Sequence, residues 1–207
     1  MDKAVLISIR PKWVEKILSG EKMLEVRKTC PKLETPFKVY IYCTQASVKY
    51  QTICGCRVLN SDELYRHPEQ GIKHGSSIEL MLCENYTKNN FLNGKVIAEF
   101  TCDRCDRVEA IKAATEPYGI YDVDDDFVAQ TRLVDGALWD YGKGATLYGW
   151  HISDLKIYDT PKKLCEFERP YECDGCDAKW ASECNACHDN NKLKHPPQSW
   201  CYVEELA

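Results

Sequence analysis

The hydrophobic pattern changes its period early in the chain. Apolar side chains first recur at helical spacing, at Trp13, Val14, Ile17 and Leu18. Gly20 follows where a left-handed C-terminal cap is expected, because glycine has no Cβ to clash in that conformation. The period then becomes two, so Leu24 and Val26 share one face of a predicted strand while Glu25 and Arg27 share the other. The sequence therefore predicts a helix, a turn, and a strand that buries its apolar face and projects two opposite charges side by side.

Other segments alternate in the same way and predict further strands. They cover residues 4–9, 37–44, 95–102, 107–111, 147–157 and 199–204. Apolar residues return to helical spacing over residues 127–139, directly after Asp122, Asp124, Asp125 and Asp126. Acidic side chains stabilise the start of a helix by about 0.3–1 kcal/mol each, and no calcium-loop spacing follows, so capping is favoured over an ion-binding loop. The pattern predicts an α+β protein.

Residues 45–93 show only short and weak patterns, which we interpret as an insertion. A chain of 207 residues can form one good hydrophobic core with a small added module. We therefore expect a single domain over residues 1–164, completed by the strand at 199–204. A cysteine-rich module is expected over residues 165–198.

Charge is unevenly distributed along the chain. The whole sequence has a net charge of −5, but residues 1–49 hold ten basic and five acidic residues. The total argues against a protein that coats nucleic acid indiscriminately, while the basic first quarter allows a local cationic surface. No apolar run is long enough to span a membrane, and no signal-peptide pattern is present, so a cytoplasmic, soluble protein without membrane contact is expected.

The thirteen cysteines are then expected to be thiols or metal ligands. The strongest metal pattern pairs Cys173 with Cys176 and Cys184 with Cys187. Two such pairs can supply four thiolates to one tetrahedral zinc, a closed site that would be structural. Possible substitute ligands are Cys165, His188, His195 and Cys201. The pair Cys102 and Cys105 has no obvious partner nearby, unless Cys54 and Cys56 approach it, and we expect it to be reduced.

The order of Gly20, Lys22, Glu25 and Arg27, after a strand and a helix, resembles the ASCH family. Residues 37–44, 94–101, 148–154 and 196–203 extend this resemblance, which is closest to the longer members found in phages and prophages. It implies a PUA-like β-barrel with flanking helices. It also implies a binding role for RNA, single-stranded nucleic acid, a nucleotide or a modified nucleoside.

Such a site needs a cation for phosphate, a group that reads a base edge, and an aromatic ring for stacking. Lys22 and Arg27 are the candidate cations, and Glu25 is the candidate base-edge acceptor. Tyr148 or Trp150 would stack on a base. The resemblance further places His151 and Ser199 near the site. The alternative is that Glu25 and Arg27 only form a surface ion pair, worth about 0–1 kcal/mol.

An enzymatic function is the second hypothesis. Amidohydrolases of the same superfamily act on acetylcytidine and are similar at Lys22 and Arg27, but their nucleophilic threonine corresponds to Glu25 here. A carboxylate cannot replace that hydroxyl, although it could act as a general base. Some ASCH proteins resemble ribonucleases, for which Lys22 with Tyr40 or His151 could supply the cation and the acid or base.

Overall fold

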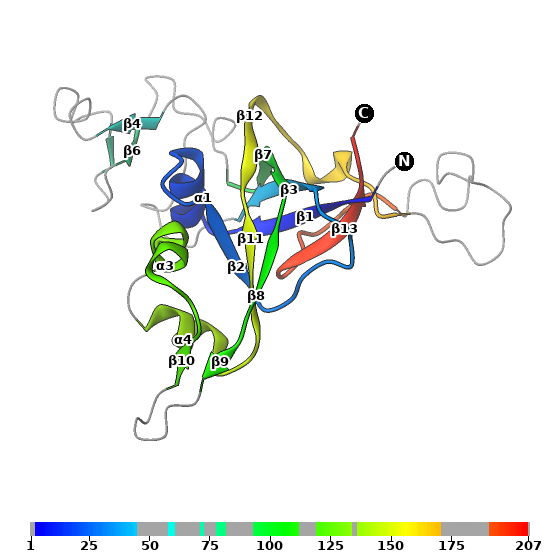
Figure 1. Cartoon of the computed structure of the whole chain (residues 1–207). Coiled ribbons are helices and arrows are strands. Elements are labelled where there is room, and N and C mark those ends of the chain that lie inside the picture. Colours follow the sequence, from blue (N-terminus) through cyan, green and yellow to red (C-terminus); the bar gives the residue numbers. More distant parts are fainter. Residues whose placement is uncertain are drawn as a thin grey trace, which may run out of the picture. The chain divides into compact units, whose positions relative to one another are not determined.

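The computed structural model (Figure 1) describes residues 3–44, 58–60, 71–72, 78–81, 93–111, 119–133, 136–170 and 191–206. In chain order the elements are β1 (Lys3–Ile9), α1 (Pro11–Leu18), β2 (Leu24–Arg27), β3 (Phe37–Cys43), β4 (Val58–Asn60), β5 (Gly71–Ile72), β6 (Ile78–Met81), β7 (Lys95–Cys102), β8 (Cys105–Val108), β9 (Ala110–Ile111), β10 (Ile120–Tyr121), α3 (Asp125–Thr131), α4 (Ala137–Gly142), β11 (Leu147–His151), β12 (Ser153–Lys162), the short 3-10 helix η4 (Leu164–Glu166) and β13 (Trp200–Glu204). The chain divides into two compact units. The first comprises residues 1–15, 39–99 and 156–207, and the second comprises residues 16–38 and 100–155.

The first unit is built on strands of a sheet with the order β12-β7-β3-β1-β13. β1 runs parallel to β3 on one side and antiparallel to β13 on the other. All residues of β1 after Lys3 are buried, which fits the apolar sequence of an interior strand. Tyr40 and Phe167 lie edge to face in the core of this unit, with their ring centroids 4.9 Å apart.

The second unit is built on the antiparallel sheet β2-β11-β8. One face of this sheet carries a hydrophobic core with residues of α3, α4 and β10. The core consists of Leu24, Val26, Val108, Tyr121, Phe127, Leu138 and Leu147. Gly149 keeps this packing close, because a Cβ there would lie 2.7 Å from Phe127 Cε2 and 2.8 Å from Leu24 Cδ2.

The local predictions are confirmed for the turn at Gly20, for the strand that follows it and for the start of α3. β2 is a strand, and Gly20 has a φ of +75°. Asp124 caps α3, where its side chain accepts a hydrogen bond of 2.7 Å from the backbone N–H of Phe127. The continuous helix expected over residues 127–139 is wrong: Arg132 ends α3 with a left-handed φ of 55°, and α4 begins after Gly136.

The expectation of a closed barrel is also wrong for the part of the chain that the structure describes. β12 and β13 are the two edges of the five-stranded sheet, and β2, β11 and β8 hydrogen-bond in a separate sheet. The α+β class holds. Most of the predicted insertion at 45–93 lies outside the described residues. The described part of that range contains the small sheet β4-β6-β5. The predicted module at 165–198 is described only at its two ends.

Candidate functional site

Lys22, Glu25 and Arg27 meet in one buried cluster in the second unit. The residues are only 3%, 7% and 8% exposed. The period-two pattern predicts Glu25 and Arg27 on one strand face, as observed. It also predicts that only the opposite face is buried, whereas every residue of β2 is buried. The surface ion pair considered from the sequence is therefore not what forms here.

Lys22 connects the start of β2 to the end of α3. Its Nζ donates hydrogen bonds of 2.8 Å to the carbonyl oxygens of Leu24 and Thr131, and it lies 3.4 Å from Oε2 of Glu25. Burial lowers the pKa of Lys22 below the ordinary 10.5, and the neighbouring Glu25 carboxylate partly offsets this effect. An ammonium group has three N–H donors, so these three acceptors can occupy all of them.

Glu25 lies between the two cations. Its Oε1 is 3.0 Å from an Nη of Arg27, while its Oε2 faces Lys22. Two charged side chains removed from water are unfavourable unless they are paired and hydrogen-bonded, and the geometry here meets both conditions. The carboxylate thus holds the guanidinium of Arg27 in a fixed position on the sheet.

The strand register sets two rows of side chains on the polar face of this sheet. Tyr148 of β11 lies opposite Arg27 on one side and Arg107 of β8 on the other. Residues directly opposite in neighbouring strands share a face and lie close enough for their side chains to interact. Tyr148 is half-buried and Arg107 is exposed. The row therefore consists of a partly accessible aromatic ring flanked by two arginines.

In the second row Trp150 lies opposite both Glu25 and Cys105. Trp150 is fully buried, and its ring meets that of Phe37 edge to face at a centroid distance of 6.0 Å. A buried ring of this kind packs in the core and is not a surface on which a base can stack. Of the two predicted stacking residues, Tyr148 is thus the accessible one.

Tyr141 and Lys28 add a further aromatic and cation. Tyr141 of α4 is 39% exposed, and Lys28 Nζ lies 5.2 Å from the centroid of its ring. Burial raises the pKa of Tyr141, and the Arg27 charge acts in the opposite direction. Sequence reasoning missed Tyr141, Arg107 and Thr131. Arg107 could have been found from the period-two pattern, but Thr131 contributes a backbone carbonyl, which no side-chain pattern reveals.

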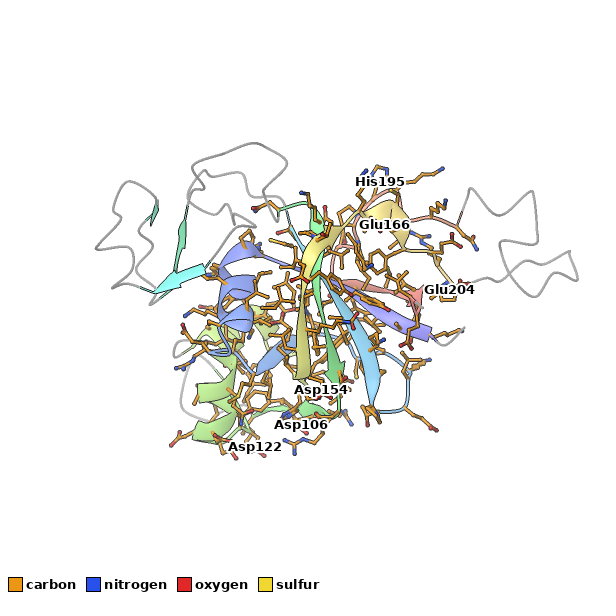
Figure 2. All side chains as sticks on the ribbon, turned by 90° about the horizontal axis from the view of Figure 1, so that it is seen from above. Asp106, Asp122, Asp154, Glu166, His195 and Glu204 are labelled. Atoms are coloured by element: carbon orange, nitrogen blue, oxygen red, sulfur yellow. The ribbon has the colours of Figure 1, made fainter. Side chains whose placement is uncertain are left out.

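His151 belongs to a different cluster. Strand alternation places it on the opposite sheet face from Tyr148, and its Nε2 lies 2.6 Å from Oδ2 of Asp106, which Figure 2 labels. Arg104 contacts both residues, at 3.0 Å from His151 Nε2 and 3.0 Å from Asp106 Oδ1. The structure therefore does not bring His151 onto the face that carries Arg27.

Ser199 belongs to the first unit, where its carbonyl oxygen accepts a hydrogen bond of 2.9 Å from the backbone N–H of Ser8. Ser8 also donates its hydroxyl to the carbonyl oxygen of Pro197 at 2.7 Å. In the same unit the hydroxyl of Tyr40 accepts a hydrogen bond from the backbone N–H of Leu206 at 2.9 Å, and the tyrosine is fully buried. The backbone of Ser199 and the hydroxyl of Tyr40 thus make their hydrogen bonds within that unit.

The four predicted zinc ligands Cys173, Cys176, Cys184 and Cys187 lie outside the described residues, as does His188. Cys165 and Cys201, two of the possible substitutes, have free thiols. Within the described ranges no group of three or more histidine, cysteine, aspartate or glutamate side chains is arranged to hold a metal ion. The helices of the same ranges include none long and apolar enough to cross a membrane.

Comparison with known proteins gave structural matches only. No family model matches the sequence, and no curated protein matches it. The chain is similar to the crystal structure of ASCH from Zymomonas mobilis, with 15% identity over 98% of this chain and 88% of that chain, at a TM-score of 0.44. It is also similar to a mutant of the same protein, with 14% identity over 98% and 89% of the two chains, at a TM-score of 0.47. Both structures carry the name of the family that the sequence resembles.

Proposed function

We propose that this chain binds a nucleic acid or a nucleotide on the polar face of the β2-β11-β8 sheet, with RNA the ligand class that the ASCH resemblance implies. The observation that carries the proposal is the row of Arg27, Tyr148 and Arg107 across three strands. An aromatic ring offers a base a stacking partner worth about 1–3 kcal/mol. An arginine beside that ring offers the backbone phosphate a forked, permanently charged donor.

In this proposal the buried residues position the site. Lys22 uses its N–H donors on Leu24, Thr131 and Glu25, and Glu25 presents both oxygens to its two cationic neighbours. Lys22 and Glu25 therefore hold the buried Arg27, which adds positive charge behind Tyr148, and direct phosphate contact falls to the exposed Arg107. This differs from the expectation that Lys22 touches phosphate and Glu25 reads a base edge.

Arg107 is available for such a contact even though it has a partner. Its Nη lies 2.6 Å from Oε1 of Glu109, but the two side chains are 68% and 53% exposed. An ion pair this exposed contributes about 0–1 kcal/mol, so a phosphate can displace the carboxylate at little cost.

The test is binding of labelled single-stranded oligonucleotides and free nucleotides, measured by fluorescence anisotropy over a range of salt concentrations. Arg107→Gln should lower the log–log salt slope by about 0.7, because one phosphate contact is lost. Tyr148→Leu should weaken binding by about 5- to 150-fold without changing the slope.

Arg104→Gln is the matched control. It removes the same charge three positions before Arg107, from an exposed side chain that contacts His151 and Asp106. Affinity and slope should stay near those of the parent protein. If Arg107→Gln and Tyr148→Leu both bind an oligonucleotide as the parent does, this sheet face is not the site.

A hydrolase, of the acetylcytidine amidohydrolase or ribonuclease type, is the second candidate. The observation in its favour is the lowered pKa of Lys22, since burial favours the neutral amine that a general base requires. Mass spectrometry of the nucleotides and oligonucleotides after incubation separates the two functions. Deacylated or cleaved product that is lost in Lys22→Met would establish turnover, whereas binding without product supports the binding protein.

We further propose a structural zinc ion at Cys173, Cys176, Cys184 and Cys187. The support is the spacing, which suits four thiolates around one tetrahedral ion. Elemental analysis of protein purified without chelator should find about one zinc per chain. Cys176→Ser combined with Cys184→Ser should abolish it, while Cys165→Ser, at an exposed thiol, should not. Metal-free protein from such a preparation would refute the site.

A further inference from the structure

Two cysteines from distant parts of the second unit meet at the surface of the sheet. Cys30 lies in the segment after β2, and Cys105 is the first residue of β8, 75 positions later. Their Sγ atoms are 2.6 Å apart. Both residues are half-buried, so the pair is sheltered by the protein but still reached by small solutes.

We propose that Cys30 and Cys105 form a reversible disulfide bond, which ties the segment after β2 to the start of β8. A disulfide requires the two sulfur atoms to approach to about 2.05 Å, so only a small movement separates the observed contact from a covalent bond. Neither cysteine belongs to the zinc pattern of the sequence, which comprises Cys173, Cys176, Cys184 and Cys187. The proposed bond pairs Cys105 with Cys30, although Cys102 is the nearer cysteine in the chain.

Cys102 is poorly placed to compete for the bond. It is fully buried, and its Sγ lies 3.3 Å from the carbonyl oxygen of Arg104. Burial raises the pKa of Cys102 and also that of Cys105, so ionisation does not distinguish the two thiols. Exchange also depends on access to the sulfur, so the fully buried Cys102 reacts more slowly than the half-buried Cys30 and Cys105.

The oxidant we envisage is a low-molecular-weight disulfide such as oxidised glutathione. The Cys30 thiolate attacks one sulfur of the oxidant, its S–S bond breaks, and one small thiol leaves. Cys105 then loses its proton to the solvent and attacks Sγ of Cys30, so that the protein disulfide forms and the second small thiol leaves. The two protein sulfurs are oxidised, and the small disulfide is reduced to two thiols.

The pKa of Cys105 is consistent with this order. Burial raises it most, and the adjacent Cys30 sulfur raises it further through a hydrogen bond and its charge. When Cys30 carries the mixed disulfide, it no longer bears a thiolate charge. Cys105 can then ionise more readily, which favours the second exchange over release of the first adduct.

Peptide mapping of the unmodified full-length protein tests the proposal directly. The protein is equilibrated in glutathione buffers of increasing oxidised fraction, its free thiols are alkylated under denaturing conditions, and it is digested with trypsin. Cleavage after Lys28, Lys32, Arg104 and Arg107 places the two cysteines in peptides 29–32 and 105–107, while Cys102 falls in the separate peptide 96–104. The expected product is peptide 29–32 linked to 105–107, lighter by two hydrogen atoms than the sum of the two peptides and absent after reduction.

Three single variants serve as controls. Cys102→Ser should retain the link, whereas Cys30→Ser and Cys105→Ser should each lose it. Recovery of both peptides in alkylated form across the whole glutathione range would overturn the proposal, as would a link from peptide 96–104. Thiols that resist alkylation under native conditions until a chelator is added, with no link found, would indicate a bound metal and would equally overturn it. Because the parent protein alone gives the deciding peptides, failure of a variant to fold leaves the test intact.

Discussion

Glu25→Gln is the most informative single change, because it keeps the shape of the side chain and removes the carboxylate that lies between Lys22 and Arg27. In the folded protein the side chains of Lys22 and Arg27 are only 3% and 10% exposed. In the variant their charges remain buried and lose the carboxylate that pairs with both of them. Breaking a buried ion pair by removing one partner typically costs about 3–5 kcal/mol. The free energy of unfolding of a native protein is about 5–15 kcal/mol, so the variant should lose a large share of its stability.

Urea unfolding followed by tryptophan fluorescence provides the measurement, since the chain has five tryptophans. Asp140→Asn is the matched control, because it removes one carboxylate from an ion pair with Lys143 whose side chains are 66% and 79% exposed. That change should shift the free energy of unfolding by less than about 1 kcal/mol. If Glu25→Gln lowers the free energy of unfolding no more than Asp140→Asn does, the buried cluster does not stabilise the fold as described.

The same variant has a characteristic pH dependence. Glu25 raises the otherwise lowered pKa of Lys22, so its removal should lower that pKa further. Lys22 then has a lower pKa in the folded variant than in the folded parent, and both values lie below 10.5. At a pH between these two values the folded variant binds fewer protons than the folded parent. Its deficit in stability should therefore shrink as the pH rises through this window. A deficit that grows with pH in that range would contradict the conclusion that Glu25 raises the pKa of Lys22.

Three further variants test other parts of the structure. Lys22→Met should show the opposite trend to Glu25→Gln: the parent gains stability as its lysine becomes neutral below pH 10.5, so urea unfolding should show a penalty that grows with pH. Gly149→Ala should cost about 1–3 kcal/mol by overpacking, because the new Cβ would lie 2.7 Å from a carbon of Phe127; thermal unfolding unchanged from the parent would disprove the close packing. Phe167→Ala should cost about 3–5 kcal/mol, since the ring is fully buried; a loss below 1 kcal/mol in urea would show that the first unit does not depend on it.

The elements that depend on neighbouring residues could be predicted from the sequence. Gly20 ends a helical pattern, β2 follows with a period of two, and Asp124 caps α3, all within a few residues. The break between α3 and α4 could not be predicted in this way. It occurs at Arg132 in a left-handed conformation, which carries no sequence signature comparable to that of glycine.

The candidate site was only half predictable for a similar reason. Alternation correctly places Glu25 and Arg27 on one face, but a period-two rule assigns charged residues to the solvent. Their burial depends on Lys22, whose bond to the carbonyl oxygen of Thr131 spans 109 positions in sequence. The aromatic character of Trp150 predicts a stacking surface for a ligand, whereas the residue is fully buried and packs edge to face against Phe37. Long-range contacts of this kind do not appear in the pattern of any one segment.

The position of β1 has a consequence for how the protein folds during synthesis. This strand lies between β3 and β13, and Lys3 is opposite Glu204. A growing chain can therefore pair β1 with β3 long before the ribosome delivers the residues of β13. Until then one edge of an almost wholly apolar strand has no partner from its own chain, and such an edge readily pairs with other chains. Nascent chains that stop short of β13 should accordingly be the aggregation-prone species and the preferred clients of ribosome-associated chaperones.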